Sequence, residues 1–314
     1  MTNMGKYILS LLVVLIAVTA SRGQQDAQYT QYMYNTMSIN PAYTGTRQAM
    51  SIVALHRSQW VGLDGAPQTQ TFNIHSPVGD RVGLGLSLVH DEIGPTSELY
   101  IDIDYSYRLK IDDDKRLSFG LKAGGHFLNV NFSKLNQYVS ELMTVDNIKN
   151  RFSPNFGVGA YYYSPRSYLG ISIPNMLETK HFNNESKSNV STNYIAKENI
   201  TYYLIGGYIF ELSPLWKFKP ATLVKVVSGS PIQWDISGNL MFNDQFIVGA
   251  AYRWSAAFSG MFGVQLSDNM LIGLAYDREI TDLGNTRFNN GSVEFILRYD
   301  FIDKVSKVIA PRFF

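Results

Sequence analysis

The side chains that could do chemistry are few and scattered along this chain. Its 314 residues include no cysteine, which excludes thiol catalysis, thiolate metal sites and disulfides. No Gly-x-Ser-x-Gly motif is present, and no nucleophile can be paired with a positioned base. The histidines lack metal-binding spacings such as His-x-x-x-His; they are His56, His75, His90, His126 and His181. We therefore predict that the protein is not an enzyme and uses no cofactor or metal.

Glycine pairs are a second pattern that could suggest ligand binding. Gly83 and Gly85, and Gly157 and Gly159, form Gly-x-Gly pairs. Both pairs fall inside predicted strands, with no following helix to bind a phosphate. We interpret them as glycines that let the strands of a barrel curve.

Charged side chains recur instead at every second position of strand-like segments. In residues 101–110 and 117–127, apolar residues at odd positions alternate with mostly polar ones at even positions. A period of two predicts strands with one apolar and one polar face. The same alternation returns in residues 293–301. The charged residues expected on the polar, lumen-facing side are Asp102, Asp104, Arg108, Lys122, Glu294 and Arg298.

Alternation along the whole chain predicts an all-β protein of about fourteen strands. Most predicted strands are about 8–13 residues long, near the 9–11 that a tilted strand needs to cross a bilayer. Their ranges are 49–57, 67–76, 81–90, 97–109, 116–127, 154–164, 167–174, 200–212, 216–227, 232–242, 246–254, 258–267, 270–277 and 292–301.

The connections between these strands alternate in length. Every second connection has about 2–6 residues, whereas the others reach about 25. Short and long connections therefore gather at opposite rims, as in an up-and-down antiparallel transmembrane β-barrel with short periplasmic turns. An even number of strands then predicts that both termini are periplasmic. The two longest connections, residues 128–153 and 175–199, are expected to be outer loops.

The apolar faces are expected to meet lipid. About eight strands suffice for a packed barrel interior, so in a barrel of about fourteen the polar face must line the lumen. The alternative is a β-sandwich with its aromatic residues in a core. At 17% charged residues and a net charge of +1, the chain offers no electrostatic case for nucleic acid. Aromatic residues at predicted strand ends, suited to interfacial girdles, are Trp60, Tyr100, Tyr107, Phe127, Tyr168, Trp216, Trp234, Trp254, Tyr299 and Phe301.

The predicted organisation has four parts. Residues 1–23 resemble a signal peptide, with Lys6 before an apolar run of about 14 residues and cleavage expected between Gly23 and Gln24. That run is shorter than the roughly 20 residues of a membrane-spanning anchor, which is the alternative. The barrel is expected over 48–301, with a periplasmic tail at 302–314.

Residues 24–47 form the remaining part and show no strand period. This segment is rich in Gln, Tyr and Asn. It could be an ordered lead-in to the first strand, a plug or a periplasmic contact. In the last two cases its anchors would be Tyr29, Tyr32, Tyr34 and Tyr43.

Several short runs, taken in order, resemble one known family. They are Gln31-Tyr32, then Asn40-Pro41-Ala42-Tyr43 with Gly45, then Arg57 with Gln59-Trp60, Gly83 with Gly85, Asp91, Gly94, residues 156–162 and 168–172, and the closing Pro311-Arg312-Phe313-Phe314. Each run is weak alone, but their order makes the chain similar to the PorP/SprF family of type IX secretion membrane proteins.

The resemblance implies an outer-membrane barrel of the Bacteroidota phylum. Members are expected to partner other type IX secretion components and a secreted cargo protein, often a surface adhesin used in gliding motility. They would help to secrete or retain that cargo by binding its C-terminal domain. The competing hypothesis is a diffusion channel or transporter for small solutes, motivated by the lumen charges. An outer-membrane hydrolase is a third hypothesis, which lacks a nucleophile–base pair.

Overall fold

The computed structural model describes residues 28–134, 147–177, 199–286 and 289–302. In these residues fifteen strands form one sheet, and every neighbouring pair is antiparallel, as in β1 with β2 and with β15. The strands are β1 Met50–Ser58, β2 Gln68–Val78, β3 Val82–Ile93, β4 Thr96–Lys110, β5 Arg116–Val130, β6 Ile148–Tyr163, β7 Ser167–Ile173, β8 Thr201–Tyr208, β9 Phe210–Glu211, β10 Trp216–Val227, β11 Gln233–Phe242, β12 Phe246–Arg253, β13 Ala257–Ser267, β14 Met270–Glu279 and β15 Ser292–Phe301.

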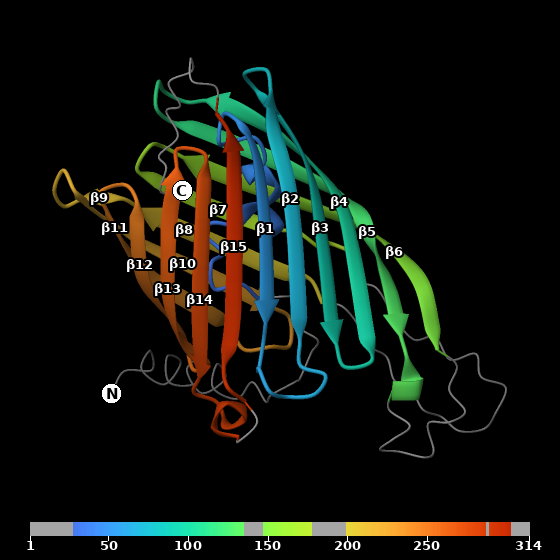
Figure 1. The fold of residues 1–314 in the computed structure, drawn as a ribbon. Coiled ribbons are helices and arrows are strands. Elements are labelled where there is room, and N and C mark those ends of the chain that lie inside the picture. Colours follow the sequence, from blue (N-terminus) through green and yellow to red (C-terminus); the bar gives the residue numbers. More distant parts are fainter. Residues whose placement is uncertain (1–27, 135–146, 178–198, 287–288, 303–314) are drawn as a thin grey trace, which may run out of the picture.

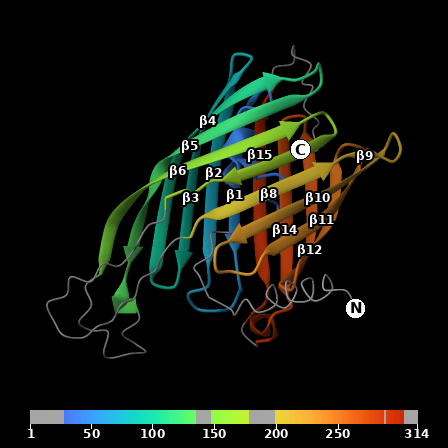
Figure 2. The same cartoon turned by 180° about the vertical axis from the view of Figure 1, so that it is seen from behind.

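The sheet closes on itself (Figures 1 and 2). From β1 to β8 and from β10 to β15, each strand pairs with the next in sequence, β8 pairs with β10, and β15 pairs with β1. The two-residue strand β9 continues β8 past the buried Ile209 and pairs with the same neighbour, β10. Counting β8 and β9 as one crossing gives a closed barrel of 14 antiparallel strands. The predicted fold class and strand number are confirmed.

Successive connections alternate between the two rims of the barrel, and all the longest ones lie at the same rim. One, here called the short-turn rim, carries the turns 79–81, 111–115, 164–166, 212–215, 243–245 and 268–269. The opposite, long-loop rim carries the connections 59–67, 94–95, 131–147, 174–200, 228–232, 254–256 and 280–291.

One predicted outer loop is shorter than expected. Strands β5 and β6 continue past their predicted ends, and Leu128 pairs with Arg151 and Val130 with Ile148. The connection is therefore 131–147 instead of 128–153. The alternation fails here because the ladder contains an irregularity between Leu128 and Val130, which shifts the side-chain period without ending the pairing. Residues 135–146 and 178–198 of the two long connections lie outside the described part of the chain.

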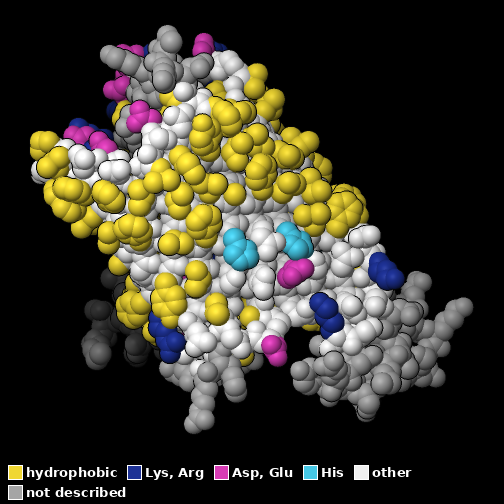
Figure 3. All heavy atoms as spheres, viewed as in Figure 1, with side chains coloured by type: hydrophobic (Ala, Val, Ile, Leu, Met, Phe, Trp, Pro, Cys, Tyr) yellow, Lys and Arg dark blue, Asp and Glu magenta, His cyan; other side chains and the backbone are white. Residues whose placement is uncertain are grey.

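The two faces of the sheet are inverted relative to a soluble protein. On β4, Ile103 is 62% exposed on the outside whereas Asp104 is 0% exposed inside. Figure 3 shows hydrophobic side chains in a broad band over the outer face, with charged groups near the two ends. An apolar outer face is stable only against lipid. In the described residues, no helix is long and apolar enough to span a membrane.

Two of the predicted girdle aromatics point inward. Tyr168 is buried and stacks on Tyr161 with ring centroids 5.9 Å apart. Tyr100 lies 5.0 Å from the buried His126 ring and donates a hydrogen bond to Glu98. These predictions were wrong because position near a strand end does not reveal which face a side chain takes. Trp216, Trp234, Trp254, Tyr299 and Phe301 are exposed on the outside, as expected.

The two ends of the described chain lie at different rims. Phe301 pairs with Met50 at the short-turn rim. Gln28, the first described residue, hydrogen-bonds Gln233 at the start of β11, on the long-loop rim. The prediction that both termini lie at one rim came from the even number of strands, and it did not include the chain that precedes β1. The predicted signal peptide (1–23) and residues 303–314 of the predicted tail lie outside the described residues.

Candidate functional site in the barrel interior

Residues 28–49, here called the lumenal segment, lie inside the barrel (Figure 1). From Tyr29 to Ala49 nearly every residue is buried. The segment contains two short 3-10 helices, η1 (Thr36–Ser38) and η2 (Pro41–Tyr43). A stretch of this length without strand or α-helical period can be buried only if its backbone polar groups find partners inside the barrel.

The local sequence explains helix η2. Asn40 caps it with its side-chain oxygen, which accepts a hydrogen bond from Ala42 N at 2.9 Å. Pro41 occupies the first helical position, where a missing N–H costs nothing. The Asn40 amide nitrogen donates to the Ala160 carbonyl at 3.1 Å. Asn40-Pro41-Ala42-Tyr43, part of the family-like signature, is therefore a capped turn that docks on β6.

An apolar core fills much of the interior. Tyr32, Met33 and Met37 of the lumenal segment cluster with Leu271 and Ile296 of the wall. The sequence predicted a polar lumen, but the part of the interior around this cluster is apolar. Period two cannot distinguish lumen from lipid where both faces of a strand are apolar, as on β14. Here the buried face meets protein instead of water.

Buried cations border this core. The Lys219 ammonium lies 4.9 Å from the centroid of the Tyr34 ring and 5.9 Å from that of Tyr168. A neutral ring face attracts a desolvated ammonium.

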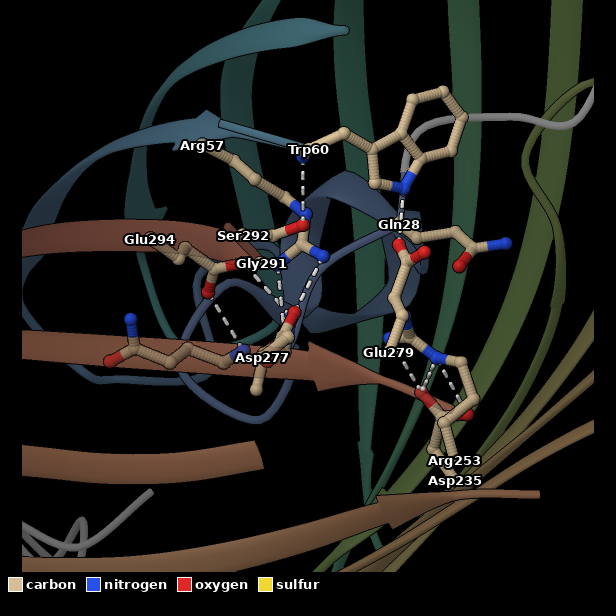
Figure 4. A network of polar contacts seen from close by, with 12 residues as sticks. Gln28, Arg57, Trp60, Asp235, Arg253, Asp277, Glu279, Gly291, Ser292 and Glu294 are labelled. Atoms are coloured by element: carbon tan, nitrogen blue, oxygen red, sulfur yellow. Dashed lines mark hydrogen bonds and ion pairs between the residues drawn. The ribbon is translucent and has the colours of Figure 1, made fainter. Parts of the chain in front are cut away.

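A charged cluster fixes the lumenal segment near the long-loop rim (Figure 4). Glu294 accepts the backbone N–H groups of Thr30 and Gln31 at 2.9 and 2.8 Å. Arg57 bridges Glu294 at 3.1 Å and Asp277 at 2.6 Å. The Thr30 hydroxyl completes the cluster with a bond to Asp277 at 2.7 Å. Charge-assisted bonds of this kind are short and directional.

A second charged cluster fixes the segment near the short-turn rim. Arg47 donates two bonds to Asp300, at 2.9 and 2.7 Å. Gly45 N donates to His75 Nδ1 at 3.1 Å, and its carbonyl accepts from Arg108 at 2.7 Å. Nearby, the Ser106 hydroxyl donates to the Thr44 carbonyl at 2.6 Å. The segment is therefore held at both rims.

Wall glycines let the segment approach the strands closely. A Cβ on Gly120 would lie 2.1 Å from Ala42 N, and one on Gly159 would lie 2.1 Å from Asn40 Oδ1. Gly83 would meet the Thr44 carbonyl at 2.4 Å. We attributed the Gly-x-Gly pairs to curvature. At Gly83 and Gly159, a side chain would overlap the lumenal segment, and this contact explains the need for glycine more directly than curvature does.

The lumen-facing charges do not form one site. Glu294, Arg298 and Arg108 lie against the lumenal segment, where Arg298 is 6.0 Å from the Tyr34 ring. Lys122, by contrast, lies between Asp102 and Asp104 at 3.3 and 3.4 Å. All six charged residues are nevertheless buried. In the described part of the chain, no three His, Asp or Glu side chains gather as metal ligands.

The other family-like residues lie in two places. Gly85 contacts Met37 of the lumenal segment, and Gln31 lies against Gly273 of the wall. The rest lie at the long-loop rim. There, Trp60 Nε1 donates to Glu279 and Asp91 accepts from Thr69. Gly94 N donates to the Gly65 carbonyl, and Gln59 N donates to the Pro67 carbonyl.

Sequence reasoning missed several residues of this interior. Asp277, Asp300, Asn73 and Gly120 contact or support the lumenal segment. Asp300 was visible as a polar position in the predicted last strand. The others carried no signal beyond being small or polar in a strand, because their partner, the segment, is far away in sequence.

A scan against models of known families matches the type IX secretion system membrane protein PorP/SprF over residues 21–299. The chain belongs to the PorP/SprF family. The resemblance inferred from the ordered motifs is therefore confirmed. A closed barrel with a lipid-facing apolar band, in a family of secretion membrane proteins, is an outer-membrane β-barrel.

Solved structures similar to this PorP/SprF barrel are distant in sequence. Acinetobacter baumannii Omp33 is 8% identical over 81% of this chain and 100% of its own, with a TM-score of 0.46. The Ralstonia pickettii toluene transporter TbuX is 11% identical over 84% and 92%, with a TM-score of 0.44. A Pseudomonas aeruginosa FadL homologue is 14% identical over 81% and 89%, with a TM-score of 0.43. No curated protein matches the chain.

Proposed function

We propose that this barrel helps the type IX secretion system to secrete or retain a cell-surface cargo, such as a gliding adhesin. It would do so by binding the C-terminal domain of that cargo. Family membership over residues 21–299 is the observation that carries the proposal. The long-loop rim is the candidate contact face, because connections of 17 residues or more, such as 131–147 and 174–200, occur there and not at the other rim.

The packed interior supports a binding role over a diffusion channel. Charged side chains of the lumen, such as Arg57, Lys219 and Asp104, are at most 2% exposed. A porin-type lumen leaves such groups in water. The lumenal segment is also tied to the wall at both rims, so it acts as a plug.

Purification from native membranes tests the proposal. A tagged barrel is isolated in mild detergent, and co-purifying proteins are identified by mass spectrometry. We expect one secreted protein to co-purify and to lose its surface location when the barrel gene is deleted. A variant of the cargo without its C-terminal domain serves as the control and should not co-purify. Normal surface display of all type IX substrates in the deletion strain would refute the proposal.

A conductance measurement tests the channel hypothesis. Purified barrel in a planar bilayer is expected to give no steady conductance, because the lumenal segment fills the interior. Stable single-channel currents from the unaltered protein would favour the diffusion channel instead.

A further inference from the structure

We infer that the lumenal segment enters the barrel from the long-loop rim, so that the mature amino-terminal end of the chain lies at the cell surface. The inference goes beyond the proposed function and does not depend on cargo binding. It concerns only the path of the backbone and the side of the membrane at which that path begins.

The strongest observation is the direction of the segment along one strand. Thr30 binds Glu294 near the start of β15, whereas Arg47 binds Asp300 near its end. At about 3.4 Å per residue, these two wall positions are about 20 Å apart. Because β15 begins at the long-loop rim and ends at the short-turn rim, residues 30–47 run through the lumen from the first rim to the second.

Contacts on other strands give the same direction. Gln28 binds Gln233, the first residue of β11, and Thr30 binds Asp277 near the end of β14. Both positions lie at the long-loop rim. At the other end, Arg108 holds the Gly45 carbonyl and also donates to the carbonyl of Gly79, in a short turn. Four strands, β4, β11, β14 and β15, and the β2–β3 turn therefore agree on the path.

This path adds one crossing to the fourteen strands. The chain enters at the long-loop rim and crosses the lumen to the short-turn rim. It reverses direction at residue 49 and returns to the long-loop rim as β1. Fifteen crossings put the two ends on opposite sides. In outer-membrane barrels the short turns face the periplasm and the long loops face outward. Phe301 is then periplasmic, and the chain before Gln28 starts beside the loops assigned to cargo contact.

Single-cysteine labelling tests this path, and the chain suits it because it contains no cysteine. Gln28→Cys reports the entry point. Asp64→Cys, in the exposed 59–67 connection, marks the long-loop rim, and Asp80→Cys, in the exposed 79–81 turn, marks the short-turn rim. Each variant is treated on intact cells with a membrane-impermeant maleimide and, in parallel, after lysis. We expect Gln28→Cys and Asp64→Cys to label on intact cells and Asp80→Cys only after lysis.

The side chain of Gln28 is only partly exposed, so the cysteine placed there could react slowly. A second measurement therefore locates the amino-terminal end without relying on that reaction. A short epitope is inserted between Gln25 and Asp26, and intact cells are stained with antibody before and after external protease. We expect staining that protease removes. The inference is overturned if the epitope is detected only after lysis while Asp64→Cys labels on intact cells. It is equally overturned if Asp80→Cys labels on intact cells and Asp64→Cys does not.

Discussion

At the scale of single residues, this protein places its charges where they hold one segment of the chain. Arg57, Asp277 and Glu294 are almost fully buried, so none is compensated by water. Each is stable inside only because the others, and the backbone N–H groups of Thr30 and Gln31, complete its hydrogen bonds. These residues therefore hold the lumenal segment in place.

The substitution Glu294→Gln is expected to destabilise the barrel. It removes one of the two carboxylate charges that balance Arg57 and places an amide donor against a backbone donor. Breaking one partner of a buried ion pair costs about 3–5 kcal/mol, and urea unfolding in lipid vesicles measures the change. Glu211→Gln is the matched control, since Glu211 pairs with Arg166 on the surface at 3.1 Å, where such pairs contribute about 0–1 kcal/mol. Equal shifts for the two variants would contradict the buried anchor.

The substitution Gly120→Ala is expected to push the lumenal segment away from β5. The added methyl would lie 2.1 Å from backbone atoms of Ala42, and overpacking costs about 1–3 kcal/mol. Limited proteolysis of reconstituted barrels should then cut the segment faster. Gly260→Ala is the control, because nothing lies within 4 Å of its Cβ position. Unchanged proteolysis of the Gly120→Ala variant would show that the contact is not tight.

At the scale of elements, the lumenal segment occupies interior space that side chains alone would fill in a smaller barrel. Eight strands enclose a space that side chains fill, but fourteen enclose a wider one. Two 3-10 turns and their neighbours supply the missing volume, and their buried polar groups bond to strand side chains such as Asn73, which donates to Asn35 at 2.6 Å. The segment is therefore part of the core of the barrel.

Deleting residues 28–47 behind the signal peptide should convert the closed barrel into a conducting one. Single-channel recording in planar bilayers measures the change, with the unaltered protein as the reference. If the deletion variant fails to fold, the double variant Glu294→Gln/Asp300→Asn weakens both anchors while keeping every residue, and brief openings are expected. A folded deletion variant that does not conduct would mean that the strands alone close the lumen.

At the scale of the whole molecule, lipid decides stability. Residues such as Ile103, Leu121 and Ile171 are more than half exposed, and in water they would drive aggregation. In a bilayer they are the favourable surface.

The position of the apolar band can be tested with arginine. Leu121→Arg lies within β5 and should cost about 2–4 kcal/mol, whereas Leu215→Arg, in a short turn, should cost about 0–1 kcal/mol. Both leucines are at least half exposed, so neither change creates a cavity. Folding equilibria in vesicles compare the two. A larger loss at Leu215 would place the membrane elsewhere on the barrel.

The sequence by itself determined the barrel, because the cause is local. Side chains at every second position of a strand point to the same face. Asp102, Asp104 and Arg108 could therefore be assigned to the inside from their spacing. The same alternation along the whole chain gave the strand number, and the lengths of the connections gave the two rims. The ordered motifs, from Gln31-Tyr32 to Tyr168-Leu169-Gly170, gave the family.

Only the tertiary structure decided what the inside contains. Residues 24–47 have no period, so spacing left their place open between a lead-in, a plug and a periplasmic contact. The position of the described residues 28–47 depends on partners more than 200 residues away, such as Asp277 for Thr30 and Asp300 for Arg47. No local pattern encodes a contact at that separation, because it exists only once the barrel has closed around the segment.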